Sequence, residues 1–405
     1  MGTLHDGQGQ MSAPLKRRIG LGLLTAYGVG VMVGAGIYVL VGAVAADAGI
    51  WAPLSFILAG LIAAPSALSY AEFSTRIPEA AGEAAYVGQG LGSQAMAVLV
   101  GLAIVTAGTV SAGAVLRGGV GYLTQVLPVG SEAAIIALGL TLVAVAVIGV
   151  LESLALAAVF TAVELIGLVL VVWAGSTGTV SPDWSLDMPP YWPGIGLGAV
   201  LAFFAFIGFE DIVNMAEEVS RPERTLPRAI LISLGVTSVI YALVSWAAVR
   251  AVPLEDLAAS KGPLALVWQS TRGGSGAFLS VIAVFAALNG VLAQIVMASR
   301  VLFGLGRRSP LLAVFRGVHP RFGTPVLATV LIGAAVILCA LFVPVADLAG
   351  VTSIILLAVF VLVNLALIFE KRRAPEAPFR VPMMVPVLGL VLAGAALAAA
   401  LGGLG

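Results

Sequence analysis

The sequence predicts an all-α membrane protein that crosses the bilayer many times. Of its 405 residues, 60% are hydrophobic and only 10% are charged, whereas soluble domains contain roughly 25% charged residues. Residues 118–220, 103 in all, contain no lysine or arginine, and a bilayer crossing needs about 20 residues. Lipid admits only helices or closed barrels, because backbone polar groups must be bonded internally. These apolar segments are too long and too continuous for barrel strands.

Eleven membrane spans are expected from windows of about 20 apolar residues that end at charges or at proline and glycine turns. The first follows the basic cluster Lys16-Arg17-Arg18, the second ends before Arg76, and the third ends at Arg117. The expected spans are 19–46, 50–73, 81–117, 132–151, 154–174, 193–218, 228–250, 275–304, 323–343, 348–369 and 382–404. The connections are short, about 25 residues at most, so the function is expected to lie within the membrane.

The basic residues predict how the chain is oriented. With a cytoplasmic N-terminus and eleven spans, sixteen lysines and arginines fall on the inside and four on the outside. The four are Arg117, Arg250, Lys261 and Arg272. Because cytoplasmic loops carry an excess of basic residues, the C-terminus is expected to face outward, in the cytoplasmic membrane of a prokaryote.

Several classes of function are excluded by composition. Twenty basic and twenty acidic residues cancel, so nucleic acid is not expected as a partner. The single cysteine, Cys339, allows neither an intramolecular disulfide nor a cysteine metal site. The two histidines, His5 and His319, lie outside the spans, which argues against an intramembrane enzyme. No cofactor and no metal are expected.

The first span contains four glycines at mid-depth, Gly28, Gly30, Gly34 and Gly36. Each weakens a helix by up to about 1 kcal/mol relative to alanine. Close helix packing is one explanation, since Gly30 and Gly34 form a GxxxG pair. The other is a local unwinding at residues 34–36, which exposes main-chain N–H and carbonyl groups. Glycine content alone does not decide between them.

The sixth span favours unwinding, because FFAFIGFED at residues 203–211 places a glycine and two carboxylates where continuous helix is expected. Breaks in spans one and six, five helices apart, predict an inverted five-plus-five repeat with a binding site between the broken helices. The expected units are a lead at 1–18, a first repeat at 19–174, a second at 193–369, and an additional helix at 382–404.

Three ordered blocks of sequence resemble the amino acid-polyamine-organocation permeases. They are YAEFSTRIP at 70–78 with GEAAY at 82–86; GFE at 208–210 with EEV at 217–219 and RPERTLPRAI at 221–230; and ASRVL at 298–302 with PRFGTP at 320–325. The resemblance covers residues 19–370 and is nearest to the cationic amino acid transporter branch and its bacterial relatives. It implies secondary transport of an amino acid by alternating access, with spans one, two, six and seven rocking against the rest. Most members have twelve or more helices, so the missing twelfth leaves oligomerisation open; a monomer or a homodimer is expected.

An amino acid substrate carries two charges, and the two broken helices can meet both. Its carboxylate is assigned to main-chain N–H groups at the start of a half-helix, which carries partial positive charge, at Gly34, Ala35, Gly36 and Ile37. Its ammonium is assigned to carbonyls at Val31, Met32, Phe204, Ala205 and Ile207, beside Gly208. One of Phe204, Phe206 and Phe209 is expected to close over the substrate, and the others to be ordinary core.

Three polar residues at depth are candidates for coupling. Glu210 resembles a glutamate that responds to protonation or cationic substrate in antiporters for basic amino acids and polyamines; a strut between helices is the alternative. Glu164 stands where proton-coupled members commonly have lysine. It is a protonatable coupling group, a ligand for sodium or a cationic substrate, or a neutral hydrogen-bonded acid. By analogy with the family, the helix of Asn289 faces the break in span one near the cation position; an interhelical hydrogen bond is the alternative.

Proton coupling is preferred to sodium, since Glu164 and Glu210 supply titratable groups at depth. Sodium symport and uncoupled exchange of basic amino acids or polyamines remain alternatives. A channel is less favoured, because charges at depth are too few for a continuous polar lining. At the predicted cytoplasmic ends, a solvated charged face is the default and an inner-gate ion pair the alternative; the residues are Glu72, Arg76, Glu217, Glu218 and Arg300. Asn364 receives no role.

Overall fold

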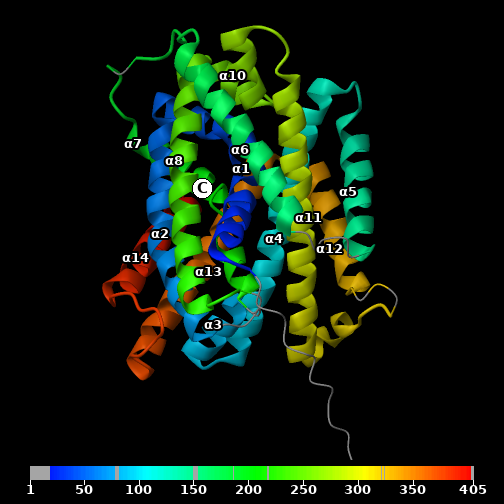
Figure 1. The fold of residues 1–405 in the computed structure, drawn as a ribbon, viewed down its shortest axis with the longest axis vertical. Coiled ribbons are helices and arrows are strands. Elements are labelled where there is room, and N and C mark those ends of the chain that lie inside the picture. The colour runs from blue at the N-terminus through cyan, green and yellow to red at the C-terminus, as the bar shows by residue number, and fades with distance from the viewer. Residues whose placement is uncertain are drawn as a thin grey trace, which may run out of the picture.

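The computed structural model describes residues 19–77, 82–148, 154–185, 187–216, 219–320, 322 and 324–402. Within these ranges the chain is helical, and its only β-type pairing is an isolated bridge between Ile19 and Val219. Most of the long helices run roughly parallel to the vertical axis of Figure 1. The helices are α1 (Leu21–Ala48), α2 (Ala52–Arg76), α3 (Gly82–Leu91), α4 (Gln94–Val126), α5 (Ser131–Ile148), α6 (Leu154–Thr177), α7 (Trp192–Phe204), α8 (Pro222–Ala251), α9 (Leu254–Ala259), α10 (Pro263–Arg272), α11 (Ala277–Arg308), α12 (Val326–Phe342), α13 (Val345–Arg373) and α14 (Met384–Gly402), with 3-10 turns η1 (Gly49–Trp51), η2 (Glu210–Met215) and η3 (Pro310–Arg316).

The described chain contains eight helical segments that are long and apolar enough to cross a membrane, and three shorter apolar helices. The short ones are Leu21–Gly34, Trp192–Phe204 and Val326–Phe342. An all-helical, polytopic membrane protein is thus confirmed. The count of eleven spans and the inverted repeat stay predictions.

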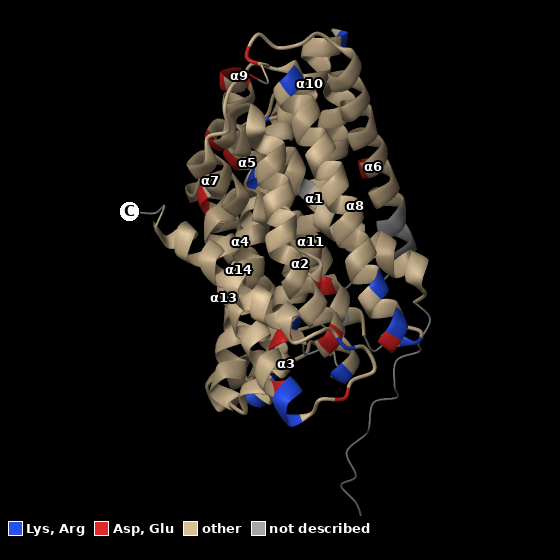
Figure 2. Ribbon diagram, turned by 90° about the vertical axis from the view of Figure 1, so that its left-hand side faces the viewer, with Lys and Arg blue, Asp and Glu red and all other residues tan. Residues whose placement is uncertain are grey.

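Two regions of the structure differ from the helices expected from the sequence. The expected third span, 81–117, is a short helix, α3, followed by the long α4, because the Ser93 hydroxyl accepts a hydrogen bond from Met96 N and begins a new helix there. The connection at 251–274 holds two short helices, α9 and α10. Figure 1 places α10 at one end of the bundle and α3 at the other. Charged residues gather near both ends in Figure 2, whereas the middle of the bundle is mostly uncharged.

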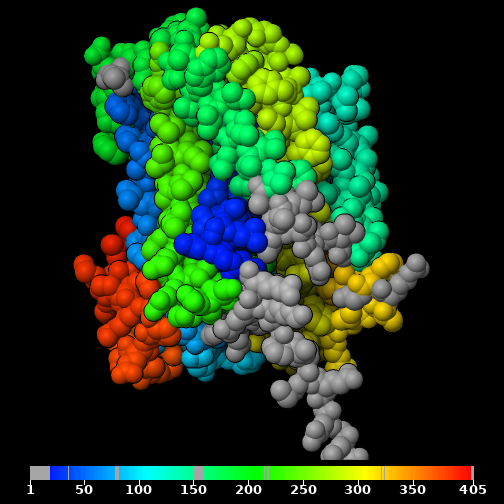
Figure 3. Space-filling model, in the orientation of Figure 1, coloured from blue at the N-terminus to red at the C-terminus, as the bar shows by residue number. Residues whose placement is uncertain are grey.

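The interior is built around α1, which packs against α6, α7 and α8, while α4 and α11 form the most extensive helix pair. The beginning of α1 reaches the surface beside α8, as Figure 3 shows. A cluster of buried aromatic rings joins α2, α3, α13 and the segment after α7. In it Tyr70 lies edge-on to Phe209 at 5.7 Å and to Phe360 at 5.4 Å, and Phe73 stacks on Tyr86 at 4.9 Å between ring centroids. This cluster holds α3 next to the break in the sixth span.

Candidate functional site

The predicted discontinuity in the first span is present at Gly34. Its backbone leaves the helical conformation, with φ 1° and ψ −144°, and divides α1 into two halves. Neighbouring glycines serve close packing instead. A Cβ at Gly36 would lie 2.9 Å from Ala205 Cα, and one at Gly30 would collide with the Thr161 hydroxyl of α6. Both explanations of the glycine run therefore hold, at different residues.

The sixth span is also discontinuous, since α7 ends at Phe204 and turns lead into η2 at Glu210. Gly208 has φ 124°, which side chains with a Cβ rarely adopt. A Cβ at Gly208 would lie 2.7 Å from Val31 Cγ1 and 3.2 Å from Met32 N. The two breaks thus face each other closely, as a site between them requires.

Tyr241 of α8 links the two breaks. Its hydroxyl lies 2.5 Å from the carbonyl oxygen of Met32 and 2.8 Å from that of Ala205, and donates toward both. These are two of the carbonyls assigned to the substrate ammonium. Tyr241 was not predicted from the sequence, because one tyrosine in an apolar helix carries no local signal of such a contact.

Replacing Tyr241 with phenylalanine (Y241F) is expected to destabilise the protein by about 1–3 kcal/mol, because two buried carbonyls lose their donor. Thermal unfolding of the purified protein in detergent measures the change. Tyr191, which is 65% exposed, provides the control Y191F. Equal melting temperatures for Y241F and Y191F would show that the hydroxyl does not link the breaks.

The three phenylalanines of the sixth-span break are all buried. Phe206 lies edge-on to Tyr241 with ring centroids 5.1 Å apart, and Phe209 packs on Tyr70. Phe204 has no aromatic ring beside it among the described residues. Phe206 and Phe209 therefore match the ordinary core interpretation, and closure over a substrate by Phe204 stays a prediction.

Glu164 of α6 is only 2% exposed, and neither of its carboxylate oxygens has a hydrogen-bond partner among the described residues. The Tyr38 hydroxyl of α1 donates to the main-chain oxygen of Glu164, at 3.0 Å, and leaves the side chain unbonded. The interpretation of Glu164 as a neutral acid with a protein hydrogen bond finds no support in this arrangement. A buried and unpartnered carboxyl calls for a proton or another cation.

A second group of carboxylates lies on the α3 side of the sixth-span break. Glu210 accepts a hydrogen bond from Gly208 N at 2.9 Å, and Asp211 accepts one from Gln294 Nε2 of α11 at 3.3 Å. Both line a small cavity together with Glu83 of α3. Burial raises the pKa of the Glu83 carboxyl, which lies outside the membrane spans, to about 7. Neither Glu83 nor Gln294 was predicted as a site residue from the sequence. Gln294 could have been, because it is a polar residue in an apolar span, as Asn289 is.

The structure gives different outcomes for the remaining candidates. Asn289 is partly buried on α11, and no hydrogen bond joins its side chain to a described residue. Arg300, also on α11, is exposed. Glu217 and Glu218 lie outside the described residues, as do residues 1–18.

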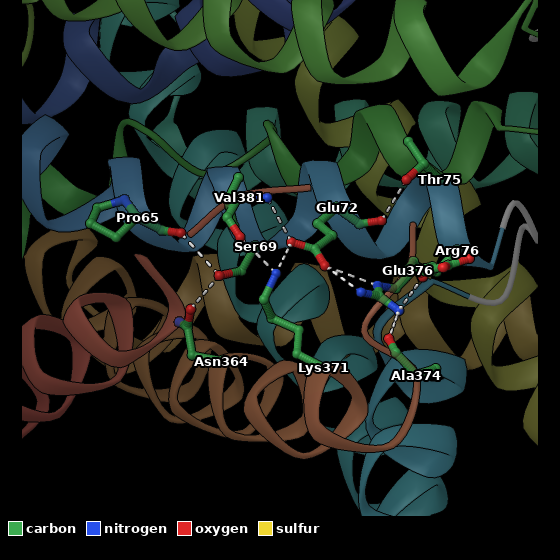
Figure 4. Close-up of polar contacts among 10 residues, drawn as sticks. All are labelled: Pro65, Ser69, Glu72, Thr75, Arg76, Asn364, Lys371, Ala374, Glu376 and Val381. Atoms are coloured by element: carbon green, nitrogen blue, oxygen red, sulfur yellow. Dashed lines mark hydrogen bonds and ion pairs between the residues drawn. The ribbon is translucent and has the colours of Figure 1, made fainter. Parts of the chain in front are cut away.

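The solvated face expected by default for Glu72 and Arg76 is wrong, and the ion pair expected as the alternative is present. A gating role for this pair stays a prediction. Glu72 is wholly buried, and its carboxylate pairs with Arg76 and with Lys371 of α13, each at 2.6 Å. It also accepts a hydrogen bond from Val381 N at 2.9 Å, and Arg76 donates to the Ala374 carbonyl (Figure 4). This network binds α2 to α13 and to the segment before α14. The pair with Arg76 is local, four residues along α2, but the pairing with Lys371 could not be read locally because Lys371 is 299 residues away.

Comparison with known proteins identifies the family. The profile of the family described as amino acid permease matches residues 19–403. The chain belongs to the amino acid permease family. The resemblance seen in the sequence blocks is confirmed, and the permease is a transporter and not an enzyme.

Several curated proteins are similar to this permease. The branched-chain amino acid permease BcaP of Bacillus subtilis is 30% identical over 93% of this chain and 86% of its own. The methylthioribose transporter of the same organism is 32% identical over 84% of this chain and 78% of its own. The mitochondrial cationic amino acid transporter 3 of Arabidopsis thaliana is 30% identical over 82% of this chain and 58% of its own. The permease therefore transports amino acids or related small molecules through a membrane.

Proposed function

We propose that this permease moves an amino acid across the cytoplasmic membrane by alternating access, in symport with protons. The observation that carries the proposal is the pair of facing breaks, at Gly34 in α1 and after Phe204 in the sixth span. Glu164, an unpartnered buried acid, lies on α6, which packs on α1 and bonds Tyr38 of that helix. Broken helices at mid-depth supply main-chain groups that continuous helices keep bonded.

The main chain at the breaks suits a zwitterion. N–H groups at Gly34–Ile37 begin the second half of α1 and meet the carboxylate. Main-chain carbonyl oxygens bind the ammonium. Two of them, those of Met32 and Ala205, accept hydrogen bonds from the Tyr241 hydroxyl in this conformation. Arrival of an ammonium donor at these oxygens releases Tyr241. Substrate binding thereby loosens the contact of α8 with both breaks.

Proton coupling is supported by Glu164. An ionised carboxylate near the bilayer centre costs about 2.5–3.5 kcal/mol on insertion scales, and no described residue offers this one a hydrogen bond. Glu164 is therefore stable in the closed bundle as the neutral acid. In an open conformation, water reaches Glu164 and lets it exchange its proton. The carboxyl takes a proton on one side of the membrane and releases it on the other, with the substrate.

The moving part is proposed to be spans one, two, six and seven, that is α1, α2, α7 with η2, and α8. Extensive packing of α1 on α7 and α8, and of α2 on α7 and α8, supports a unit that moves together. The inverted repeat, the cytoplasmic N-terminus and the outward C-terminus belong to this proposal.

Proteoliposomes with an imposed gradient test the coupling. The purified permease is expected to accumulate amino acid when a proton gradient is applied and not when a sodium gradient replaces it. In E164Q, gradient-driven accumulation is expected to disappear while exchange of labelled for unlabelled substrate continues, because glutamine cannot carry a proton. The control is E376Q, since Glu376 is exposed. Uptake driven by sodium alone, or full accumulation by E164Q, would contradict the proposal. Wild-type exchange of labelled for unlabelled substrate without any accumulation in a proton gradient would identify an uncoupled exchanger.

A further inference from the structure

Three carboxyl groups from two separate elements meet below the sixth-span break. Glu210 and Asp211 begin η2, and Glu83 lies in the first turn of α3. All three are buried, with exposed fractions of 4%, 7% and 4%. A buried cluster of acids is costly unless protons or cations neutralise it.

The cavity that these acids line contains a further unbonded polar group. Ser111 of α4 lines it, is 5% exposed, and makes no hydrogen bond with any described residue. Gln294 lies on the same wall and donates to Asp211. A hydroxyl on a cavity wall that has no protein partner normally bonds a bound molecule or water.

The charges around the cavity do not neutralise the acids. Tyr70 of α2 lies beside Glu83, and Tyr27 of α1 lies near Asp211. The positive charge of Arg300, on α11, interacts with Tyr27. Arg300 is exposed, however, and among the described residues it forms no ion pair with the three acids. The residues of α4 and α13 that line the cavity are uncharged.

The size and ligands of the cavity restrict what it binds. Its free space is sufficient for about one water molecule, which excludes an amino acid or a guanidinium group in this conformation. In the described part of the chain, no three acidic, histidine or cysteine side chains have the geometry of a metal site. A proton, shared between carboxyls and one water, is the ligand that fits.

We infer that Glu83, Glu210 and Asp211, with Ser111 and Gln294, form a second proton-binding site of this permease, separate from Glu164. The inference deepens the proposed proton symport and rests on it for its role in transport. Glu83 lies on a short helix outside the spans and is the group through which this site exchanges protons with water at the α3 end. A proton bound here neutralises the cluster when the break is closed, and its release leaves like charges that favour opening at the α3 end.

Infrared difference spectroscopy tests the site without any transported substrate. The permease in lipid is titrated from pH 5 to pH 9, and the carbonyl absorption of protonated carboxyl groups is followed. The wild type is expected to lose absorption as the pH rises through neutrality. E83Q and D211N are each expected to lose at least half of that change, while E164Q and the exposed control E376Q keep the part that titrates near neutrality.

E83D separates loss of the proton site from loss of the fold, because it keeps a carboxyl at the same place. It is expected to retain the absorption change, and each variant is accepted only with a wild-type elution profile in size exclusion. Spectra of E83Q and D211N that coincide with the wild type would overturn the inference. Failure of a proton gradient to drive wild-type uptake would overturn the proposed symport instead, and leaves the spectral result unchanged.

Discussion

Replacing Gly208 with alanine (G208A) is expected to lower amino acid transport by about 100-fold, the loss that a displacement of about 1 Å at a reacting or binding centre produces. The φ of 124° at Gly208 is strained for alanine, at a cost of about 1–3 kcal/mol. The new methyl group would also lie 2.7 Å from Val31 Cγ1 and 3.2 Å from the Met32 nitrogen. Relief of these contacts separates the two breaks, and with them the groups assigned to the substrate.

Substrate exchange in proteoliposomes measures this effect, with Gly235→Ala as the matched control. Gly235 lies in α8 and is exposed, and a methyl group at this position would have no heavy atom of a neighbouring element within 4 Å. G235A is therefore expected to transport like the wild type. Normal exchange by G208A would mean that the facing breaks are not the substrate site.

Replacing Glu72 with glutamine (E72Q) is expected to destabilise the permease by about 3–5 kcal/mol, because it removes one side of a buried ion network. Arg76 and Lys371 would both remain buried, at exposed side-chain fractions of 5% and 2%, without their carboxylate. The segment that begins α14 would also lose the charged acceptor of Val381 N. Thermal unfolding in detergent is the measurement.

E376Q makes the same chemical change on the exposed Glu376, whose main-chain oxygen touches the network while its side chain does not. A change within about 0.5 kcal/mol is expected there, as for ordinary surface substitutions. A melting temperature of E72Q close to that of E376Q would show that the network does not hold α2 to α13.

Local sequence was sufficient to place the two breaks. Gly34 and Gly208 stand in apolar spans where helix propensity and the demands of lipid both act over a few residues. The same local reasoning was wrong for Glu72, since an acid near a helix end is usually solvated. Its carboxylate is buried because Lys371, 299 residues away, lies against it. Tyr241 and Glu83 were missed for the same reason: each acts through a contact with another helix.

Hydrophobicity and glycine placement, read from the chain alone, determined that this protein spans a membrane as helices and that the first and sixth spans break. These properties depend on each segment and the lipid around it, so no partner helix is needed to predict them. Only the tertiary structure decided what surrounds the buried acids. Two cations pair with Glu72, no described side chain bonds the Glu164 carboxylate, and Glu83 lines a cavity together with Glu210 and Asp211. Desolvation and Coulomb interactions act through space over a few ångströms, and distance along the sequence does not measure them.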